Sequence, residues 1–286
     1  MTDTAPLPII RLRPNAAARA IRFGFPWVYD NELVMDRRSR KIDAGTLGIL
    51  QDADRNDLGL VAINPNSKIV ARVLDGDINA TIDANWFRGK FRRALDFRAR
   101  LFDRPFYRLI HAESDGLPGV IIDRFDDHFV VQPNAAWADR LLDALVDALV
   151  EVTGVRVVIK NASGRTRGLE GLDDVPQVLR GDMPSAPIQV PMNGAIYMAD
   201  LAGGQKTGLF YDQRPNHAFA AGLSKDARVL DVFSHVGGFS LAALQQGRIM
   251  PWRLMVRLRR LIWRNKARPR WVFRTGSKPV VEMPLM

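Results

Sequence analysis

A chain of 286 residues can bury a sizeable core and has room for two or three domains. It contains no cysteine, which excludes disulfides, thiolate metal sites and a cysteine nucleophile, and we expect no metal. The net charge is +10, but residues 248–286 hold eleven Lys/Arg and one acid, so this tail carries the whole excess and the preceding 247 residues are neutral. The charge is therefore no argument that the folded domains bind nucleic acid. Without an apolar run of about 18 residues or a signal-peptide pattern, we expect no transmembrane segment and a cytoplasmic location.

Residues 1–75 are typical of a small β-rich domain. Ile9–Arg13 predicts a strand, and Asn15 is the expected cap of a short helix, Ala16–Arg22, that Gly24 ends. Turn-rich segments separate three later apolar runs, as in a compact barrel: 48–50, 60–63 and 69–74. In the segment Phe25–Tyr29 the two larger aromatics, Trp27 and Tyr29, are interpreted chiefly as barrel core.

Residues 83–104 predict a helix or helix pair that begins at Asp83 as its cap. Its expected apolar stripe is Trp86, Phe91, Leu95 and Phe102, and seven basic residues between Arg88 and Arg104 face only two acids. Such an excess of cations can follow a phosphate backbone, although a solvated helix face has the same pattern.

Residues 105–202 predict a β-β-α-β-β module. A hairpin over 120–131 precedes a helix from Ala135 to about Val152, and the later strands lie at 155–159 and 188–198, the second turning at Asn193-Gly194. A catalytic cluster of His111, Glu113, Ser114 and Asp115 is conceivable. Turn chemistry explains these residues better, because Gly116, Pro118 and Gly119 follow directly.

Residues 203–247 hold the segment around which the function is organised. Val229–Phe233 reads as a buried strand, Ser234–Gly238 as a turn and the residues from Phe239 as a helix. Two adjacent glycines at such a corner let a ligand approach the backbone near the helix N-terminus, although corners of this kind also occur in proteins that bind nothing there.

Four segments, in this order, resemble the bacterial 23S rRNA cytosine carbon-5 methyltransferases that carry an N-terminal PUA domain. They are Phe25–Tyr29, Tyr107–Gly119, Lys206–Arg214 and Val229–Ser240. The resemblance implies a multidomain fold of α+β and α/β parts: a PUA-like β-barrel (1–75), a linker helix with the β-β-α-β-β module (76–202), the start of a Rossmann-like methyltransferase domain (203–247) and a basic tail outside the family pattern (248–286).

The same resemblance implies S-adenosylmethionine as cofactor and ribosomal RNA as partner, and a homodimer is compatible with it. By this likeness the cofactor residues are Lys206, Phe210, Gln213, Arg214, Phe233, Ser234, Gly237 and Gly238, with Tyr211 and Asp212 beside them. The implied RNA contacts are Arg19, Arg22, Trp27, Arg92 and Arg93.

Methylation of cytosine carbon-5 needs a thiolate that adds to the neighbouring ring carbon, and the sequence offers none. An acid that could hold the cofactor ribose is absent too, since only Glu282 follows Asp231. We therefore predict no catalytic residue, and we expect an inactive chain whose catalytic domain is truncated, or read out of frame, after its first βα unit.

The tail leaves two alternatives open. It is either an accidental sequence or a basic amphipathic helix with Arg253, Arg257, Arg260 and Arg264 on one face, which would bind a polyanion or a membrane surface. A third reading of the whole chain is a non-catalytic RNA-binding protein that acts through its PUA-like domain.

Overall fold

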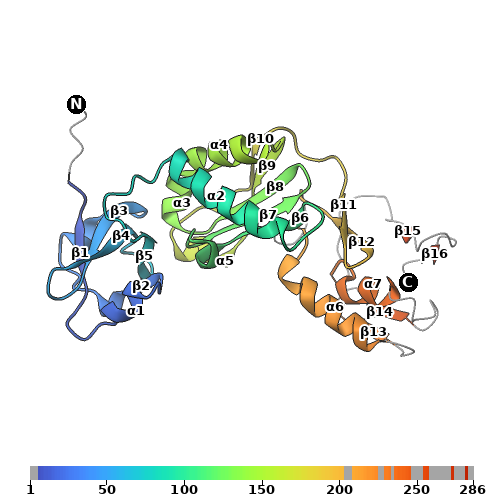
Figure 1. The fold of residues 1–286 in the computed structure, drawn as a ribbon, viewed down its shortest axis with the longest axis horizontal. Coiled ribbons are helices and arrows are strands. Elements are labelled where there is room, and N and C mark those ends of the chain that lie inside the picture. Colours follow the sequence, from blue (N-terminus) through green and yellow to red (C-terminus); the bar gives the residue numbers. More distant parts are fainter. Residues whose placement is uncertain are drawn as a thin grey trace. The chain divides into compact units, whose positions relative to one another are not determined.

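The computed structural model of the chain describes residues 6–202, 208–224, 229–232, 235–245, 254–257, 272–273 and 281–282 (Figure 1). Two compact units divide it: residues 1–188 with 200–211, and residues 189–199 with 212–286. Both contain helices and strands, so the protein is a multidomain α/β structure. Among the helices in these ranges, none has the length and apolar character that crossing a membrane requires.

The first unit begins with a five-stranded sheet in the order β1-β3-β4-β5-β2. Only β1 and β3 pair in parallel. A bridge between Leu12 and Leu33 links the segments that follow the two edge strands, which closes the sheet into a barrel. The elements are β1 (Ile9–Arg11), α1 (Ala18–Arg22), β2 (Trp27–Tyr29), the 3-10 turns η1 (Asp30–Glu32) and η2 (Ser39–Lys41), β3 (Thr46–Gln51), β4 (Asp57–Ile63) and β5 (Ile69–Asp75).

The barrel core is aliphatic, and Trp27 and Tyr29, which were interpreted chiefly as core, are only half-buried and are not among its members. Ile10, Val28, Leu50 and Ile63 are among its buried members. The predicted cap is wrong: α1 starts after Ala17, and no side chain caps it. Gly24 follows the helix with φ +93°, a conformation that glycine adopts without strain.

Helix α2 (Ala84–Ala99) follows the barrel, and the Asp83 carboxylate accepts a hydrogen bond from the Trp86 backbone N–H at 2.9 Å, as a cap should. The predicted apolar stripe is only partly right. Phe87, Phe91, Ala94 and Arg98 are the buried positions, whereas Trp86 is half-buried.

A second five-stranded sheet, in the order β10-β9-β8-β7-β6, forms the centre of the first unit. β8 and β9 pair in parallel and the other pairs are antiparallel. The elements are β6 (Phe106–His111), η3 (Ala112–Asp115), β7 (Val120–Phe125), β8 (His128–Pro133), α3 (Ala136–Arg140), α4 (Leu142–Thr153), β9 (Val157–Lys160), α5 (Arg165–Leu169) and β10 (Gln177–Arg180).

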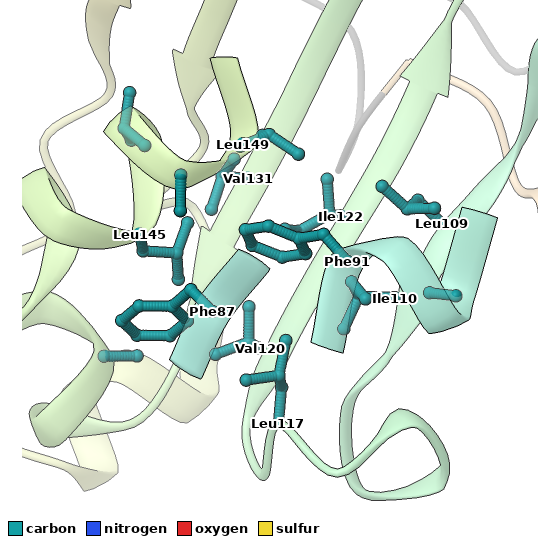
Figure 2. Packing of buried hydrophobic residues seen from close by; sticks show 14 of the residues in the cluster. Phe87, Phe91, Leu109, Ile110, Leu117, Val120, Ile122, Val131, Leu145 and Leu149 are labelled. Carbon is teal, nitrogen blue, oxygen red and sulfur yellow. The ribbon is translucent and has the colours of Figure 1, made fainter. Parts of the chain in front are cut away.

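One apolar core joins α2 and α4 to this sheet. Figure 2 shows the rings of Phe87 and Phe91 among side chains of the strands and of α4, such as Ile122 and Leu149, all fully buried. The Phe87 ring also stacks on Trp137, with 6.1 Å between centroids.

The central module differs from the expected one in three ways. β6 adds a strand before the helix, the single predicted helix is two (α3 and α4) that meet at Leu141, and the strands at 188–198 do not join this sheet. Those residues form a separate hairpin, β11 (Ile188–Met192) and β12 (Ala195–Ala199). Its turn is the predicted Asn193-Gly194, with positive φ at both residues.

A buried carboxylate connects the barrel to the central module. Glu170, directly after α5, accepts hydrogen bonds from Ser67 Oγ at 2.8 Å and from Asn64 Nδ2 at 3.0 Å, and it pairs with Arg72 Nη2 at 2.7 Å. Glu170 and Arg72 are 3% and 7% exposed. Within the first unit, the two domains are therefore held together by a satisfied ion pair rather than by a flexible linker alone.

The second unit contains the β11–β12 hairpin, α6 (Arg214–Leu223), which continues the 3-10 turn η4 (Tyr211–Gln213), then β13 (Val229–Val232) and α7 (Gly238–Gln245). α7 packs against α6, β12 and β13. The remaining strands are β14 (Leu254–Arg257), β15 (Val272–Phe273) and β16 (Val281–Glu282).

The backbone of 254–257 corrects the expectation for the tail. β14 pairs in parallel with β13, so residues 254–257 form a strand, whereas one of the two alternatives left open placed Arg257 in a basic helix. β13, α7 and β14 form a β-α-β unit, one more strand than the single βα unit expected from the sequence. Arg253, Arg260 and Arg264 lie outside the described residues.

Candidate functional site

The glycine corner lies between β13 and the first turn of α7. Gly237 has φ +74°, and Gly238, the first residue of α7, is buried. The buried Asp231 carboxylate, in β13, accepts a hydrogen bond from the Ser240 backbone N–H at 3.1 Å. The end of the strand thus fixes the start of the helix.

Gly238 lacks a side chain for a reason that the sequence did not show. A Cβ atom there would lie 2.4 Å from both Cε1 and Nε2 of His217, in α6. The ring of His217 fills this space, so glycine at this position serves helix packing, whereas we expected it to admit a ligand. Gly237, with its positive φ, makes the turn itself.

Tyr197 holds the same peptide from the other side. Its hydroxyl donates a hydrogen bond to the Gly238 carbonyl at 3.3 Å, and its ring stacks on His217 with 6.3 Å between centroids. Burial raises the pKa of Tyr197 to about 12, against the opposing effect of the nearby Arg214 charge. Tyr197 is therefore a neutral donor throughout the physiological range.

His217 is uncharged at neutral pH. Burial lowers its pKa, and the charges of Asp231 and Asp212 oppose that shift. The side chain is 5% exposed, its Nδ1 has no hydrogen-bond partner in the described part of the chain, and Phe239 meets the ring edge-on at 4.5 Å. The ring is therefore an uncharged, buried group that packs against Gly238 and Phe239 at the start of α7.

Gln213 and Arg214 lie where η4 becomes α6. The side chain of Gln213 accepts a hydrogen bond from Asn216 Nδ2 at 3.0 Å, and the Arg214 carbonyl accepts one from Asn193 Nδ2 at 2.9 Å. Both residues are half-buried. The hydrogen bond from Asn193 thus ties the start of α6 to the turn of the β11–β12 hairpin.

The other predicted cofactor residues are placed differently. Phe210 is half-buried and belongs to the first unit with Tyr211. Tyr211 is buried there: its ring contacts Phe125 at 5.2 Å between centroids and its hydroxyl donates to the Arg124 carbonyl at 2.8 Å. Lys206, Phe233 and Ser234 lie outside the described residues.

The predicted RNA contacts of the barrel have local partners. Arg22 forms an ion pair with Asp52, and Trp27 donates from Nε1 to Glu113 at 2.9 Å, which joins the barrel to the central module. The guanidinium of exposed Arg19 lies 5.6 Å from the ring centroid of Phe23, itself 80% exposed. Compared with Arg22 and Trp27, whose polar groups already have partners in the protein, Arg19 and Phe23 are the more accessible pair.

Arg92 and Arg93 of α2 are exposed, but they do not share a face. Successive residues of a helix are about 100° apart, so Arg92 and Arg93 point to opposite flanks of the buried stripe.

The cluster of His111, Glu113, Ser114 and Asp115 was expected to be structural. Asp115 pairs with Arg98 at 2.6 Å, and Glu113 accepts hydrogen bonds from Trp27 and from the Gly119 N–H, so both carboxylates hold the fold.

Sequence reasoning missed Tyr197 and His217. The hairpin signal at Asn193-Gly194 did predict a strand through Tyr197, but nothing local indicates that this strand packs on α7. Their role depends on contacts between segments about 20 to 40 residues apart in the chain.

A family model for a PUA-like domain matches residues 10–75. Ribosomal RNA large subunit methyltransferase I of Aliivibrio fischeri (strain MJ11) is 37% identical over 232 residues, 80% of this chain and 58% of that protein. The protein of the same name from Shewanella frigidimarina (strain NCIMB 400) is 34% identical over 241 residues, 83% of this chain and 60% of that protein. The chain thus spans about three fifths of the length of these relatives.

Two solved structures resemble the fold. One, from Streptococcus mutans, is assigned as a SAM-dependent methyltransferase, with TM-score 0.71 and 17% identity, covering 88% of this chain and 71% of that chain. The other, SMU.776, is assigned as a methyltransferase and was solved with SAH, with TM-score 0.69 and 16% identity, covering 90% and 70%. At these identities the likeness shows the fold alone, which is multidomain α/β.

Proposed function

We propose that the chain acts in S-adenosylmethionine-dependent methylation of ribosomal RNA at cytosine carbon-5. The observation that carries this proposal is the 37% identity to ribosomal RNA large subunit methyltransferase I, which extends over four fifths of the chain. The domain bounds read from the sequence, the cytoplasmic location and a homodimer belong to the same proposal.

The corner in the second unit fits the proposed cofactor. The N-terminus of α7 carries a partial positive charge, which suits the carboxylate of an amino-acid ligand, and Arg214 is the cation that the sequence likeness assigns to the same ligand. Gly237, with φ +74°, makes the turn that leads into this helix N-terminus. When bound, S-adenosylmethionine supplies an activated methyl group. We assign Gln213, Arg214 and Gly237 to this site; Lys206, Phe210, Phe233, Ser234 and Gly238 are proposed as cofactor residues on the sequence likeness alone.

The chain's own residues orient the backbone of the proposed cofactor site and take no part in methyl transfer. Tyr197 and His217 hold the Gly238 peptide, and Asp231 holds the first turn of α7. Addition of a thiolate to the cytosine ring needs a cysteine, and these residues contain none. We therefore propose that the 286 residues bind cofactor and RNA without transferring the methyl group.

The RNA contacts are proposed on the PUA-like barrel and on α2. Arg19, Arg22 and Trp27 are the barrel candidates, with Arg19 favoured because it is exposed beside Phe23. Arg92 and Arg93 are the candidates on α2, where both are exposed.

A radiolabelled methyl-transfer assay on 23S rRNA, combined with filter binding of the same RNA, tests the proposal. We expect specific RNA retention without incorporation of label. Incorporation would contradict the assignment of a non-catalytic role to these residues. RNA retention that is no stronger than for an unrelated RNA of equal length would contradict the substrate assignment.

A non-catalytic RNA-binding protein is the second candidate, and the absence of cysteine favours it. The two candidate functions differ in what they require of the second unit. The first candidate requires the corner to bind S-adenosylmethionine or its product, whereas a simple RNA-binding protein does not.

A further inference from the structure

Helix α2 and its C-cap present a flank that carries both aromatic and basic residues. Positions that recur every three or four residues lie on one side of a helix. The flank consists of Trp86, Lys90, Arg93, Phe97 and Arg100, at intervals of four, three, four and three residues. It lies beside the buried stripe through Phe87 and Phe91, so it borders the core without entering it.

The N-terminal end of this flank is already satisfied by the protein. Trp86 Nε1 donates to Asp75 Oδ2 at 2.8 Å, and the Lys90 ammonium lies 4.5 Å from the centroid of the Trp86 ring. Both side chains are half-buried. This end has little capacity left for a ligand.

The C-terminal end of the flank differs, because Phe97 is 53% exposed. The Arg98 guanidinium lies 5.2 Å from its ring centroid. Arg98 is buried and fixed by Asp115 at 2.6 Å and by the Arg108 carbonyl at 3.0 Å. Phe97 is therefore an exposed ring placed against a rigid cation, and the adjoining Leu101 is 56% exposed.

The two cations that flank Phe97 are available to an anion. Arg93 and Arg100 are exposed, and within the described ranges neither has a carboxylate at ion-pair distance, whereas Arg88 pairs with Glu151 at 2.7 Å. Asp96 and Asp103 are exposed neighbours in sequence, and they leave the local balance positive.

We propose that Arg93, Phe97 and Arg100 bind single-stranded RNA, with one unpaired base stacked on Phe97 and the adjacent phosphates on the two arginines. Aromatic rings interleaved with cations are the chemistry that recognises single strands, because every unpaired base has a face to stack and every linkage a charge. The site rests on the proposed RNA substrate and specifies its form. A duplex would offer phosphates to the arginines but no base to Phe97.

Fluorescence anisotropy of the full chain with a labelled, unstructured RNA of twelve nucleotides tests the site. Phe97→Leu keeps apolar volume and removes the aromatic face, so we expect affinity to fall by about 5- to 100-fold, and Phe97→Tyr should retain most of it. The double change Arg93→Ala and Arg100→Ala should reduce the slope of log affinity against log salt by about 1.4. Arg88→Ala, which changes an arginine of the same helix that lies on the opposite flank and already pairs with Glu151, is the matched control and should do less.

The outcomes separate this site from the wider proposal. If the unchanged chain binds the RNA but Phe97→Leu behaves as Arg88→Ala does, the site is wrong while the RNA-binding function stands. Equal losses on a blunt duplex would also overturn the stacking role. No RNA binding by the unchanged chain would remove both. Loss of binding to anionic vesicles, with RNA affinity unchanged, would mean that the patch serves a membrane surface. Circular dichroism and thermal midpoints confirm that each variant is folded.

Discussion

Glu170 shows how a single buried residue fixes the relation of two domains. It is in the central module, yet its partners Asn64, Ser67 and Arg72 belong to the barrel. Glu170→Ala would leave Arg72 buried without its partner, and we expect the free energy of unfolding to fall by about 3–5 kcal/mol. Glu151→Ala, which removes an exposed ion pair with Arg88, should cost at most about 1 kcal/mol. Urea titrations measure both, and equal losses would contradict a structural role for Glu170.

The same carboxylate predicts a pH dependence. Burial alone would raise the pKa of Glu170, but the Arg72 charge and the hydrogen bonds from Asn64, Arg72 and Ser67 together hold it below 4.5. The folded state therefore binds the proton less tightly than the unfolded state. The stabilisation is complete above pH 4.5 and is lost as the pH falls through the folded-state value. Between about pH 7 and about pH 3, the free energy of unfolding should fall less in Glu170→Gln than in the unchanged chain.

Gly238 and His217 form a pair that a double-mutant cycle can test. Gly238→Ala places a Cβ against the His217 ring, and overpacking of this kind costs about 1–3 kcal/mol. His217→Ala makes room for this Cβ, so Gly238→Ala should cost less in a chain that already carries His217→Ala than in the unchanged chain. Hydrogen exchange at the amides of α7 reports the effect. Strict additivity would show that the two residues do not touch.

At the scale of elements, α2 separates residues that hold the fold from residues that face solvent. Phe87→Ala or Phe91→Ala should cost about 3–5 kcal/mol, since both rings are fully buried in the core of Figure 2. Phe97→Ala, on the same helix, should change stability by no more than about 0.5 kcal/mol. Thermal unfolding distinguishes them, and a large loss from Phe97→Ala would place that ring in the core.

Local chemistry explains which elements the sequence could predict. Asp83 as a cap and Asn193-Gly194 as a hairpin turn are confirmed because each depends on a few adjacent residues. The stripe of α2 was predicted in part, since Trp86 and Phe87 are adjacent and only the packing of the sheet decides which of them enters the core. The cap at Asn15 and the single helix over 135–152 were wrong. Residues 254–257, which one of the two alternatives for the tail placed in a helix, form β14 because they pair with β13, a contact distant in sequence that overrides local preference.

At the scale of the whole molecule, the candidate site was predictable only where it is local. The glycine corner could be read directly, and the strand-turn-helix there is as expected. The roles of Tyr197 and His217 could not be read from the sequence, because the hairpin and α6 bring them to the corner from distant parts of the chain. The cofactor and RNA roles of the remaining residues stay predictions.

The central claim is that the second unit binds S-adenosylmethionine at this corner. Titration calorimetry of the full chain with S-adenosylhomocysteine tests it most directly. We predict one-to-one binding that Arg214→Ala weakens by about 10- to 100-fold, the usual effect of losing a charge-assisted hydrogen bond. No heat of binding, or an affinity that Arg214→Ala leaves unchanged, would contradict the claim.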